Sequence, residues 1–566
     1  MHEIKAESFL SRIVGWGTAF TTVFLISGSV TDPVNAPKFV SLGVMATAAM
    51  FLLITSLKSR LKTNFSLVIL FAIFTVFLLI STFASNAPLS QILYGAYGRN
   101  NGLLTYLFLI LIMLSAATFR SIESFNLIIR ALLVAGTINI FYCLWVILFG
   151  DFVGWDNRYG NILGTLGNPN FIGAFLGIVF SSLIALAIDS KSSRKIRFFA
   201  FGLLPICAFE IIDSSAIQGR VVALFGSSIV LFMYFRSRFN IYVLIAYSAS
   251  SIFTGVLALL GALQMGPLSD FIYKRSVSLR GQYWLAGWNT GQEHPFTGVG
   301  MDAFGDWYRR TRDVHALELP GVNIVVNAAH NVPLDIFAFG GWPLFLSYMM
   351  FIGIAGVALI KSISRTKRFD LVLAILGSAW AGYQLQSIIS INQIGLAVWG
   401  WLLGGALIGY ERATRNNEIQ SVSADLSKKK SKNTTSNSSK PKDLVLATTG
   451  AVCGLMIALP PLSADLALRS AQLSRSVEAI EKTMEHGYFN PQNVNKYLMN
   501  IQLFEQSNIQ ELSHKHALEA VRWNPDSYDL WRMLFLIQKS SEEEKALAVS
   551  NMKRLDPLNP DVTETR

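Results

Sequence analysis

A long polar interval inside a succession of apolar runs begins MGPLSDFIYKRSVSLRGQYWLAGWNTGQEHPFTGVGMDAFGDWYRRTRD at residues 265–313. It closes within NAAHNVPLDIFAFGGWP, residues 327–343. Apolar runs flank the interval on both sides, so we interpret 266–331 as a large loop between two apolar helices. A cation and three aromatic rings recur in this loop at helical spacing: Arg280, Tyr283, Trp284 and Trp288. We expect a helix there whose face binds a ligand or takes part in catalysis.

The composition is that of a membrane protein. Of the 566 residues, 52% are hydrophobic and only 15% are charged, and the mean hydropathy is +0.43, outside the range of soluble domains. The first apolar run is too long for a signal-peptide core and lacks a cleavage pattern, so we expect it to be retained. The three cysteines all lie in apolar runs and suit neither a disulfide nor a metal site. The sequence predicts an all-α polytopic membrane protein with no metal and no cofactor.

Repeated apolar runs are long enough to cross a bilayer, which needs about 20 helical residues. They predict about twelve core transmembrane helices and one extra span, near residues 9–30, 39–57, 66–84, 103–119, 126–150, 171–189, 196–212, 219–235, 240–265, 331–360, 370–389, 392–410 and 444–462. Basic residues cluster in every second connection, at 58–62, 120, 191–197, 236–238, 361–368 and 428–430. By the positive-inside rule these connections are cytoplasmic. The N-terminus is then inside, and both the large loop and the C-terminus are outside.

Shifts in composition divide the chain into four parts. We predict a polytopic membrane domain at 1–411, a disordered cytoplasmic linker at 412–443, a last transmembrane helix at 444–464 and an extracytoplasmic helical domain at 465–566. In the last part, Pro525 and Pro557 close two similar helical segments 32 residues apart. This spacing resembles tetratricopeptide repeats. The domain could pack against its own membrane domain or bind a protein partner, and both interpretations remain open.

Basic residues on the predicted outer side are scarce and therefore informative. They are Lys38, Arg99, Arg220 and Arg280. Each could simply extend to lipid headgroups. Together the three arginines indicate an anion-binding site at the membrane surface, because a guanidinium binds phosphate oxygens in pairs and stays charged. A diphosphate attached to a lipid would arrive at this level, so we predict diphosphate binding by Arg99, Arg220 and Arg280.

One histidine, His330, lies where the large loop meets the next apolar run. An imidazole can accept a proton from a hydroxyl near pH 7, although a histidine that only closes a loop is the simpler interpretation. The Gly167-Asn-Pro-Asn170 turn precedes another apolar run and either shapes its start or admits a ligand. We predict His330 as the catalytic residue, with supporting roles for Tyr283, Trp284, Trp288, Asn331, Asn168 and Asn170.

Several short motifs occur in one order and on one predicted side. They are Gly95-x3-Arg99-x2-Gly102, Gly167-Asn-Pro-Asn170, Gln218-Gly219-Arg220, Arg280-x3-Trp284, His294-Pro-Phe-x-Gly298-x-Gly300 and His330-Asn331. Over roughly residues 10–410 this set resembles the O-antigen ligase and polymerase superfamily of bacterial membrane glycosyltransferases. The tail looks like a variant of that architecture. The family often has Ser-Arg-Gly where this chain has Gln218-Gly219-Arg220.

The resemblance implies a GT-C-like fold in the bacterial cytoplasmic (inner) membrane. It implies transfer of a glycan from a polyprenyl (undecaprenyl) diphosphate carrier, without nucleotide sugar or metal. Arg220 and Arg280 would hold the diphosphate, and His330 would deprotonate the acceptor hydroxyl. The expected partners are the lipid-linked donor, a glycan, lipid or protein acceptor, membrane lipid and a protein bound to the C-terminal repeats. No nucleic acid is expected, because the net charge of +11 is accounted for largely by the cytoplasmic connections.

Several alternatives remain open within and beyond this family. The enzyme could act as a ligase, as a polymerase of polysaccharide repeat units or as a protein O-oligosaccharyltransferase. A secondary transporter would also have about twelve spans, but it should carry ionisable residues near the span centres. The main candidate for such a residue, Glu210, lies near the end of its apolar run. A scaffold protein would explain the tail but not the large loop.

Overall fold

Long apolar helices build the part of the chain that the computed structural model describes, residues 2–155, 157–415 and 441–563. The long helices are α1 (His2–Val23), α2 (Asn35–Ser56), α4 (Phe65–Ala84), α6 (Leu103–Ala117), α7 (Ile122–Phe149), α8 (Pro169–Ile188), α9 (Arg194–Asp213), α10 (Ile217–Arg238), α11 (Ile241–Ala262), α15 (Val332–Arg365), α16 (Leu371–Ile389), α17 (Ile394–Arg415) and α19 (Pro441–Ser474). The connections hold α3 (Lys58–Thr63), α5 (Leu89–Tyr94), η1 (Gly164–Leu166), α12 (Ser269–Ile272), α13 (Arg275–Glu293), α14 (Phe304–Thr311) and η2 (Val314–Leu317).

Every predicted span coincides with one of these long helices. Ten of them are long and apolar enough to cross a membrane, so the all-α polytopic fold is confirmed. The other three helices, α1, α6 and α9, are shorter or less apolar, and their crossing stays a prediction, as does the likeness to the GT-C fold. Large apolar side chains such as Phe83, Phe198 and Leu224 are exposed on the bundle, as expected where helices face lipid.

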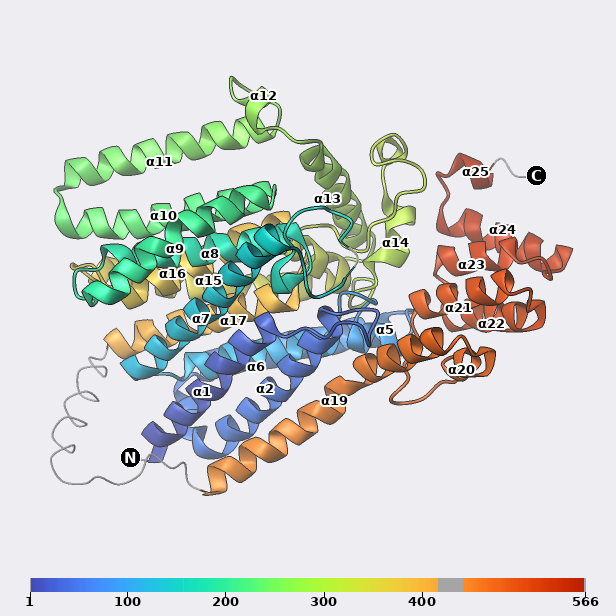
Figure 1. Ribbon diagram of the computed structural model, residues 1–566, viewed down its shortest axis with the longest axis horizontal. Helices are drawn as coiled ribbons and strands as arrows, with labels where there is room; N and C mark the ends of the chain where they lie inside the picture. Colours follow the sequence, from blue (N-terminus) through green and yellow to red (C-terminus); the bar gives the residue numbers. More distant parts are fainter. Residues whose placement is uncertain (1, 156, 416–440, 564–566) are drawn as a thin grey trace.

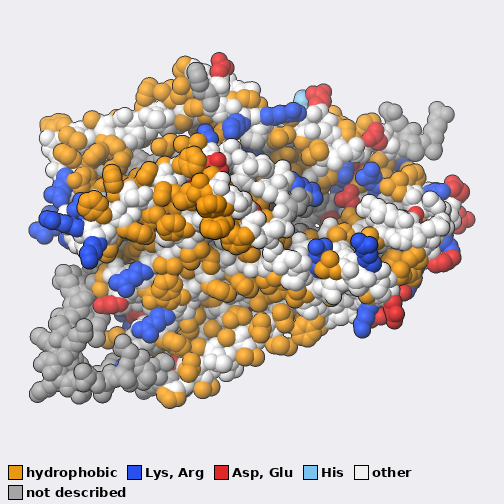
Figure 2. All heavy atoms as spheres, viewed as in Figure 1, with side chains coloured by type: hydrophobic (Ala, Val, Ile, Leu, Met, Phe, Trp, Pro, Cys, Tyr) orange, Lys and Arg blue, Asp and Glu red, His pale blue; other side chains and the backbone are white. Residues whose placement is uncertain are grey.

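The two ends of the bundle differ in what they carry. The N-terminus lies at one end, whereas α5, α12, α13, α14 and the C-terminal helices lie at the other (Figure 1). We call this second end the loop end. Apolar side chains cover the middle of the molecule, and lysine and arginine side chains gather at the end opposite the loop end (Figure 2). The side of the membrane that the loop end faces stays a prediction.

The last long helix, α19, packs closely against α2. A Cβ atom on Gly43 would lie 2.6 Å from the Ala458 side chain, and one on Gly450 would lie 2.6 Å from the Thr47 carbonyl oxygen. Such close approach of backbones is a common way for membrane helices to associate. The helix spans 441–474 and is longer than the predicted 444–464. Of the predicted linker 412–443, residues 412–415 belong to α17, and 416–440 lie outside the described residues.

The C-terminal domain is helical and contains two consecutive helix pairs. Its elements are α20 (Val477–Lys482), α21 (Val494–Gln506), α22 (Gln510–Trp523), α23 (Tyr528–Leu536), α24 (Glu542–Leu555) and α25 (Pro560–Thr563). The second helices of the two pairs, α22 and α24, end just before Asn524-Pro525 and Asp556-Pro557, at the predicted interval. A proline cannot donate to the preceding turn, so each helix stops there. The assignment as tetratricopeptide repeats stays a prediction.

Candidate functional site

Arg99 lies in a tight loop that joins α5 to α6. The Asp302 carboxylate organises this loop, because it accepts hydrogen bonds from the backbone N–H of Ala96 at 2.7 Å and of Asn101 at 3.3 Å. Gly95 has φ +88°, and a Cβ atom there would lie 2.7 Å from the same carboxylate. Only glycine fits this position. The Gly95-x3-Arg99-x2-Gly102 motif is therefore a turn that presents Arg99 at the loop end.

The Gly298–Gly300 turn of the large loop packs against α15 at a point where the helix is interrupted. Gly340 and Gly341 have non-helical backbone angles inside α15. The backbone N–H groups of Val299 and Gly300 donate to the carbonyls of Ala338 and Phe339, each at 3.0 Å. Backbone groups freed within a membrane helix need such partners, because water is scarce there. The break thereby ties the large loop to the first turns of α15, where His330 lies.

His330 immediately precedes the cap of α15. Its φ of +55° is in the left-handed region, which is uncommon for a residue other than glycine. Asn331 caps the helix by accepting from the Leu334 N–H at 3.1 Å, as expected of an N-cap asparagine. The Asp335 carboxylate accepts from the Ala329 N–H at 2.6 Å. These bonds on both sides of His330 hold its backbone in the unusual conformation and direct the imidazole.

The aromatic side chains of α13 pack against His330 and the start of α15. The Tyr283 ring lies 5.3 Å from the imidazole, centroid to centroid. The Trp284 indole N–H donates to the His330 carbonyl at 3.3 Å. Trp288 lies farther along and packs against Phe337 of α15 at 5.3 Å. Tyr283 and Trp284 therefore contact His330 directly, whereas Trp288 joins α13 to α15.

Arg99, Arg280 and His330 share one electrostatic environment. Burial, together with the nearby charges of Arg99 and Arg280, lowers the pKa of His330 to about 3. Burial raises the pKa of the Asp302 carboxyl, while the neighbouring Arg99 opposes that rise. The imidazole is thus neutral near pH 7 and can accept a proton. Among the described residues, the Nη1 atom of Arg99 is buried without a hydrogen-bond partner, as expected where a ligand completes the site.

The other basic residues lie apart from this cluster. The Arg220 side chain is exposed, and its guanidinium donates a hydrogen bond to the Ile212 carbonyl at 3.5 Å. Its neighbour Gly219 allows α10 to approach α8, because a Cβ atom there would lie 2.6 Å from the Gly173 carbonyl oxygen. Lys38 is fully buried and donates to three carbonyls at the end of α1. Lys38 is therefore structural, and diphosphate binding by Arg220 stays a prediction.

The Gly167-Asn-Pro-Asn170 turn starts α8. The Asn168 side chain caps this helix by accepting from the Asn170 N–H at 2.9 Å, and it donates to the Tyr159 hydroxyl at 3.1 Å. Pro169 occupies the first helical position, where its missing N–H costs nothing. The motif thus shapes the start of the helix, and a contact between Asn168 or Asn170 and a ligand stays a prediction.

Two carboxylates that organise the site were not predicted. Asp302 accepts hydrogen bonds from a loop some 200 residues earlier in the chain. No local sequence pattern predicts such a contact. Asp335 lies five residues beyond His330 and does not share its helical face; it acts instead on the Ala329 N–H. The signal available in the sequence was the acidic residue in the first turn of α15, where it also interacts favourably with the helix dipole.

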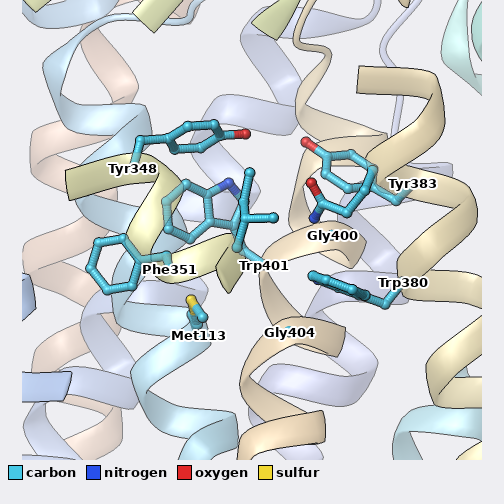
Figure 3. Close-up of a pocket in the computed structure, with 10 residues that line it drawn as sticks. Met113, Tyr348, Phe351, Trp380, Tyr383, Gly400, Trp401 and Gly404 are labelled. Atoms are coloured by element: carbon cyan, nitrogen blue, oxygen red, sulfur yellow. The ribbon is translucent and has the colours of Figure 1, made fainter. Parts of the chain in front are cut away.

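A small pocket lies within the bundle, away from the predicted residues, and its volume of about 20 Å³ has room for about one water molecule. Figure 3 shows the hydroxyls of Tyr348 and Tyr383 turned toward one another near Trp401, with Phe351, Trp380 and Met113 around the lower part. The Trp401 ring lies 5.8 Å from Phe351 and 5.9 Å from Tyr348. None of the predicted site residues lines this cavity. It belongs to the aromatic core between α6, α15, α16 and α17.

Comparison with known proteins finds a family model that matches part of the chain. In the described part of the chain, no group of three or more His, Cys, Asp or Glu side chains could hold a metal ion. Comparison with curated proteins returns no match. The O-antigen ligase family model matches residues 211–349, a segment that contains Arg220, Arg280 and His330. In that segment, about a quarter of the chain, the protein is similar to the O-antigen ligase family.

Proposed function

We propose that this protein transfers a glycan from a polyprenyl diphosphate carrier to an acceptor hydroxyl at the outer face of the bacterial cytoplasmic membrane. The observation that carries the proposal is the shared environment of Arg99, Arg280 and His330. Two cations beside a neutral imidazole suit a reaction in which a diphosphate is the leaving group and a hydroxyl loses its proton. The unpartnered Nη1 atom of Arg99 supports an anionic ligand in the same place.

The proposed reaction is a single displacement. The acceptor oxygen attacks the anomeric carbon of the donor glycan, and the bond from that carbon to the diphosphate oxygen breaks. The bonding electrons go to the diphosphate, whose charge Arg99 and Arg280 stabilise. The proton of the acceptor hydroxyl passes to His330. Arg220, exposed at the same end of the bundle, would be an outer contact for the diphosphate or the glycan.

Donor binding would also adjust the base. In the free protein the pKa of His330 is low because of burial and because Arg99 and Arg280 are close. A bound diphosphate would offset the two positive charges, and an opposite charge nearby raises the pKa of an imidazole. His330 would therefore become a stronger base once the donor is in place. This order protects the donor, because a hydroxyl is activated only beside a bound diphosphate.

The test of the proposal uses purified protein supplied with a polyprenyl-diphosphate-linked glycan. Separate reactions contain a lipid-core saccharide, a repeat-unit glycan or a Ser/Thr peptide as acceptor. We expect release of polyprenyl diphosphate together with a glycosylated product in one of the three reactions. If no acceptor is glycosylated but the donor or a small solute crosses a proteoliposome membrane, a transporter is the correct assignment.

Substitutions of Arg280 test the diphosphate contact. Arg280→Lys keeps the charge but loses the planar fork, and Arg280→Ala loses both. We expect both variants to bind the donor more weakly, with Ala the weaker. Arg275→Ala is the matched control, because Arg275 lies on the same helix and is exposed. Unchanged donor affinity in both Arg280 variants would remove Arg280 from the site.

A further inference from the structure

The C-terminal domain is joined to the large loop by a buried ion cluster. Asp556 accepts from Arg309 at 2.8 Å and from Arg312 at 2.7 Å. The side chains of Arg312 and Asp556 have no exposed surface. Nearby, Arg310 pairs with Asp526 at 3.0 Å. Removing one partner from such a cluster leaves charges buried and unpaired, so the cluster holds the two parts together firmly.

Equivalent residues of the two helix pairs make these contacts. Asp556 follows α24, and Asn524 follows α22 at the same position, 32 residues earlier. The Asn524 side-chain amide donates to the Asp306 carboxylate of α14 at 3.3 Å and to the side-chain oxygen Oε1 of Gln91 at 3.4 Å. Both pairs therefore direct the residue after their second helix toward α14. This face of the domain is occupied by the protein's own large loop.

One set of contacts leads from α14 to His330. The Tyr308 ring of α14 lies 6.2 Å from the Tyr283 ring, which lies 5.3 Å from the imidazole of His330. The hydroxyls of Thr311 and Thr290 are 2.8 Å apart and join α14 to α13. A shift of α14 would therefore move the aromatic face against which His330 packs.

A second set of contacts leads to Arg99. The Gln91 amide of α5 donates to Asp306 at 3.0 Å. The Ser90 hydroxyl of the same helix donates to the Gln492 carbonyl of the C-terminal domain at 3.0 Å. Helix α5 ends at Tyr94, directly before the turn that presents Arg99. Figure 1 shows α5, α14 and the C-terminal helices together at the loop end.

We propose that the C-terminal helical domain holds the Arg99 turn and the His330 loop at their working separation. Asp556 acts as a positioning residue for His330 through α14 and Tyr308. Asn524 acts as a positioning residue for Arg99 through Asp306 and α5. The inference rests on the proposed function, because it assigns the domain to the same site. It also agrees with one of the two interpretations of the tail, that it packs against its own membrane domain.

The test compares the full-length variants Asp556→Asn and Asn524→Ala in donor binding and in turnover. Asp556→Asn should lower kcat at least tenfold and leave donor Kd within twofold of the wild type. The reason is that it disturbs the position of His330 but not the contact with the diphosphate. Asn524→Ala should raise donor Kd at least threefold. Glu542→Gln is the control, since it makes the same acid-to-amide change on α24 at a side chain that is 91% exposed. A general loss of folding would change both parameters together, and thermal unfolding of each variant measures it.

If Asp556→Asn does not fold, a second variant tests whether α14 positions His330. Tyr308→Leu keeps the ion cluster and removes the ring between α14 and Tyr283, so it should also lower kcat with donor Kd unchanged. Wild-type kcat in Tyr308→Leu, or in a folded Asp556→Asn, would overturn the inference. Failure of the proposed function would appear differently, as full transfer by a variant that lacks His330.

Discussion

Replacement of Arg99 by alanine tests whether this half-buried cation binds the donor. The Nη1 atom of Arg99 has no partner among the described residues, so a phosphate oxygen can bind it without breaking an existing hydrogen bond. A hydrogen bond to a charged group is worth about 1.5–3 kcal/mol. Loss of that single contact should weaken donor affinity about 10- to 150-fold. Arg99→Lys should recover part of the loss, because it restores the charge but not the fork.

Arg220 supplies the comparison, since its side chain is exposed and hydrated. An exposed ion pair contributes about 0–1 kcal/mol, so Arg220→Ala should weaken donor affinity less than about sixfold. Binding of a polyprenyl diphosphate to each variant in lipid nanodiscs measures both effects, and thermal unfolding confirms that the variants are folded. Arg99→Ala with wild-type affinity, or Arg220→Ala with the larger effect, would refute the reasoning.

Two further predictions follow from the same region. Because the pKa of His330 is lowered to about 3, kcat/KM for the donor should be flat from pH 5 to pH 8. Arg280→Ala removes a neighbouring cation, so it should raise the pKa of His330 and move the acid limb of this profile upward. An acid limb near pH 6.5 in the wild type would contradict this. Separately, Gly298→Ala should lower thermal stability, since Gly298 has φ +62° and a Cβ atom would overlap the Phe339 backbone; the left-handed backbone alone costs about 1–2 kcal/mol. Gly202→Ala is the control, as a Cβ atom there meets no neighbour, and equal unfolding temperatures for the two variants would contradict the prediction.

Hydropathy was sufficient to predict where the long helices lie along the chain. Each apolar run became a helix because length and apolar content are local properties. The helical face of Tyr283 and Trp284 was also predictable, since spacing along one helix determines which side chains share a face. The end of the repeats at Asn524 and Asp556 was predictable for the same reason, because the prolines that follow them are local signals.

Contacts between distant segments were not predictable in this way. Asp302 organises the Arg99 turn, which lies about 200 residues earlier in the sequence. Asp556 pairs with Arg309, which is 247 residues away in the sequence. The arginines of α14 add to the basic residues of the large loop, yet their charges are paired within the chain. The five-residue spacing of His330 and Asp335 does not place them on one helical face. It therefore gave no sign of the hydrogen bond that the Ala329 N–H donates to the Asp335 carboxylate. Only the three-dimensional arrangement shows which charges remain available to a ligand.

The most direct test of the account is single-turnover transfer by His330→Ala. The variant is first loaded with a polyprenyl-diphosphate-linked glycan and then mixed with the acceptor that the wild type uses. We predict donor affinity within threefold of the wild type and transfer slowed at least about 100-fold, the typical contribution of a general base. Transfer at the wild-type rate by a folded, donor-loaded His330→Ala would contradict the central claim.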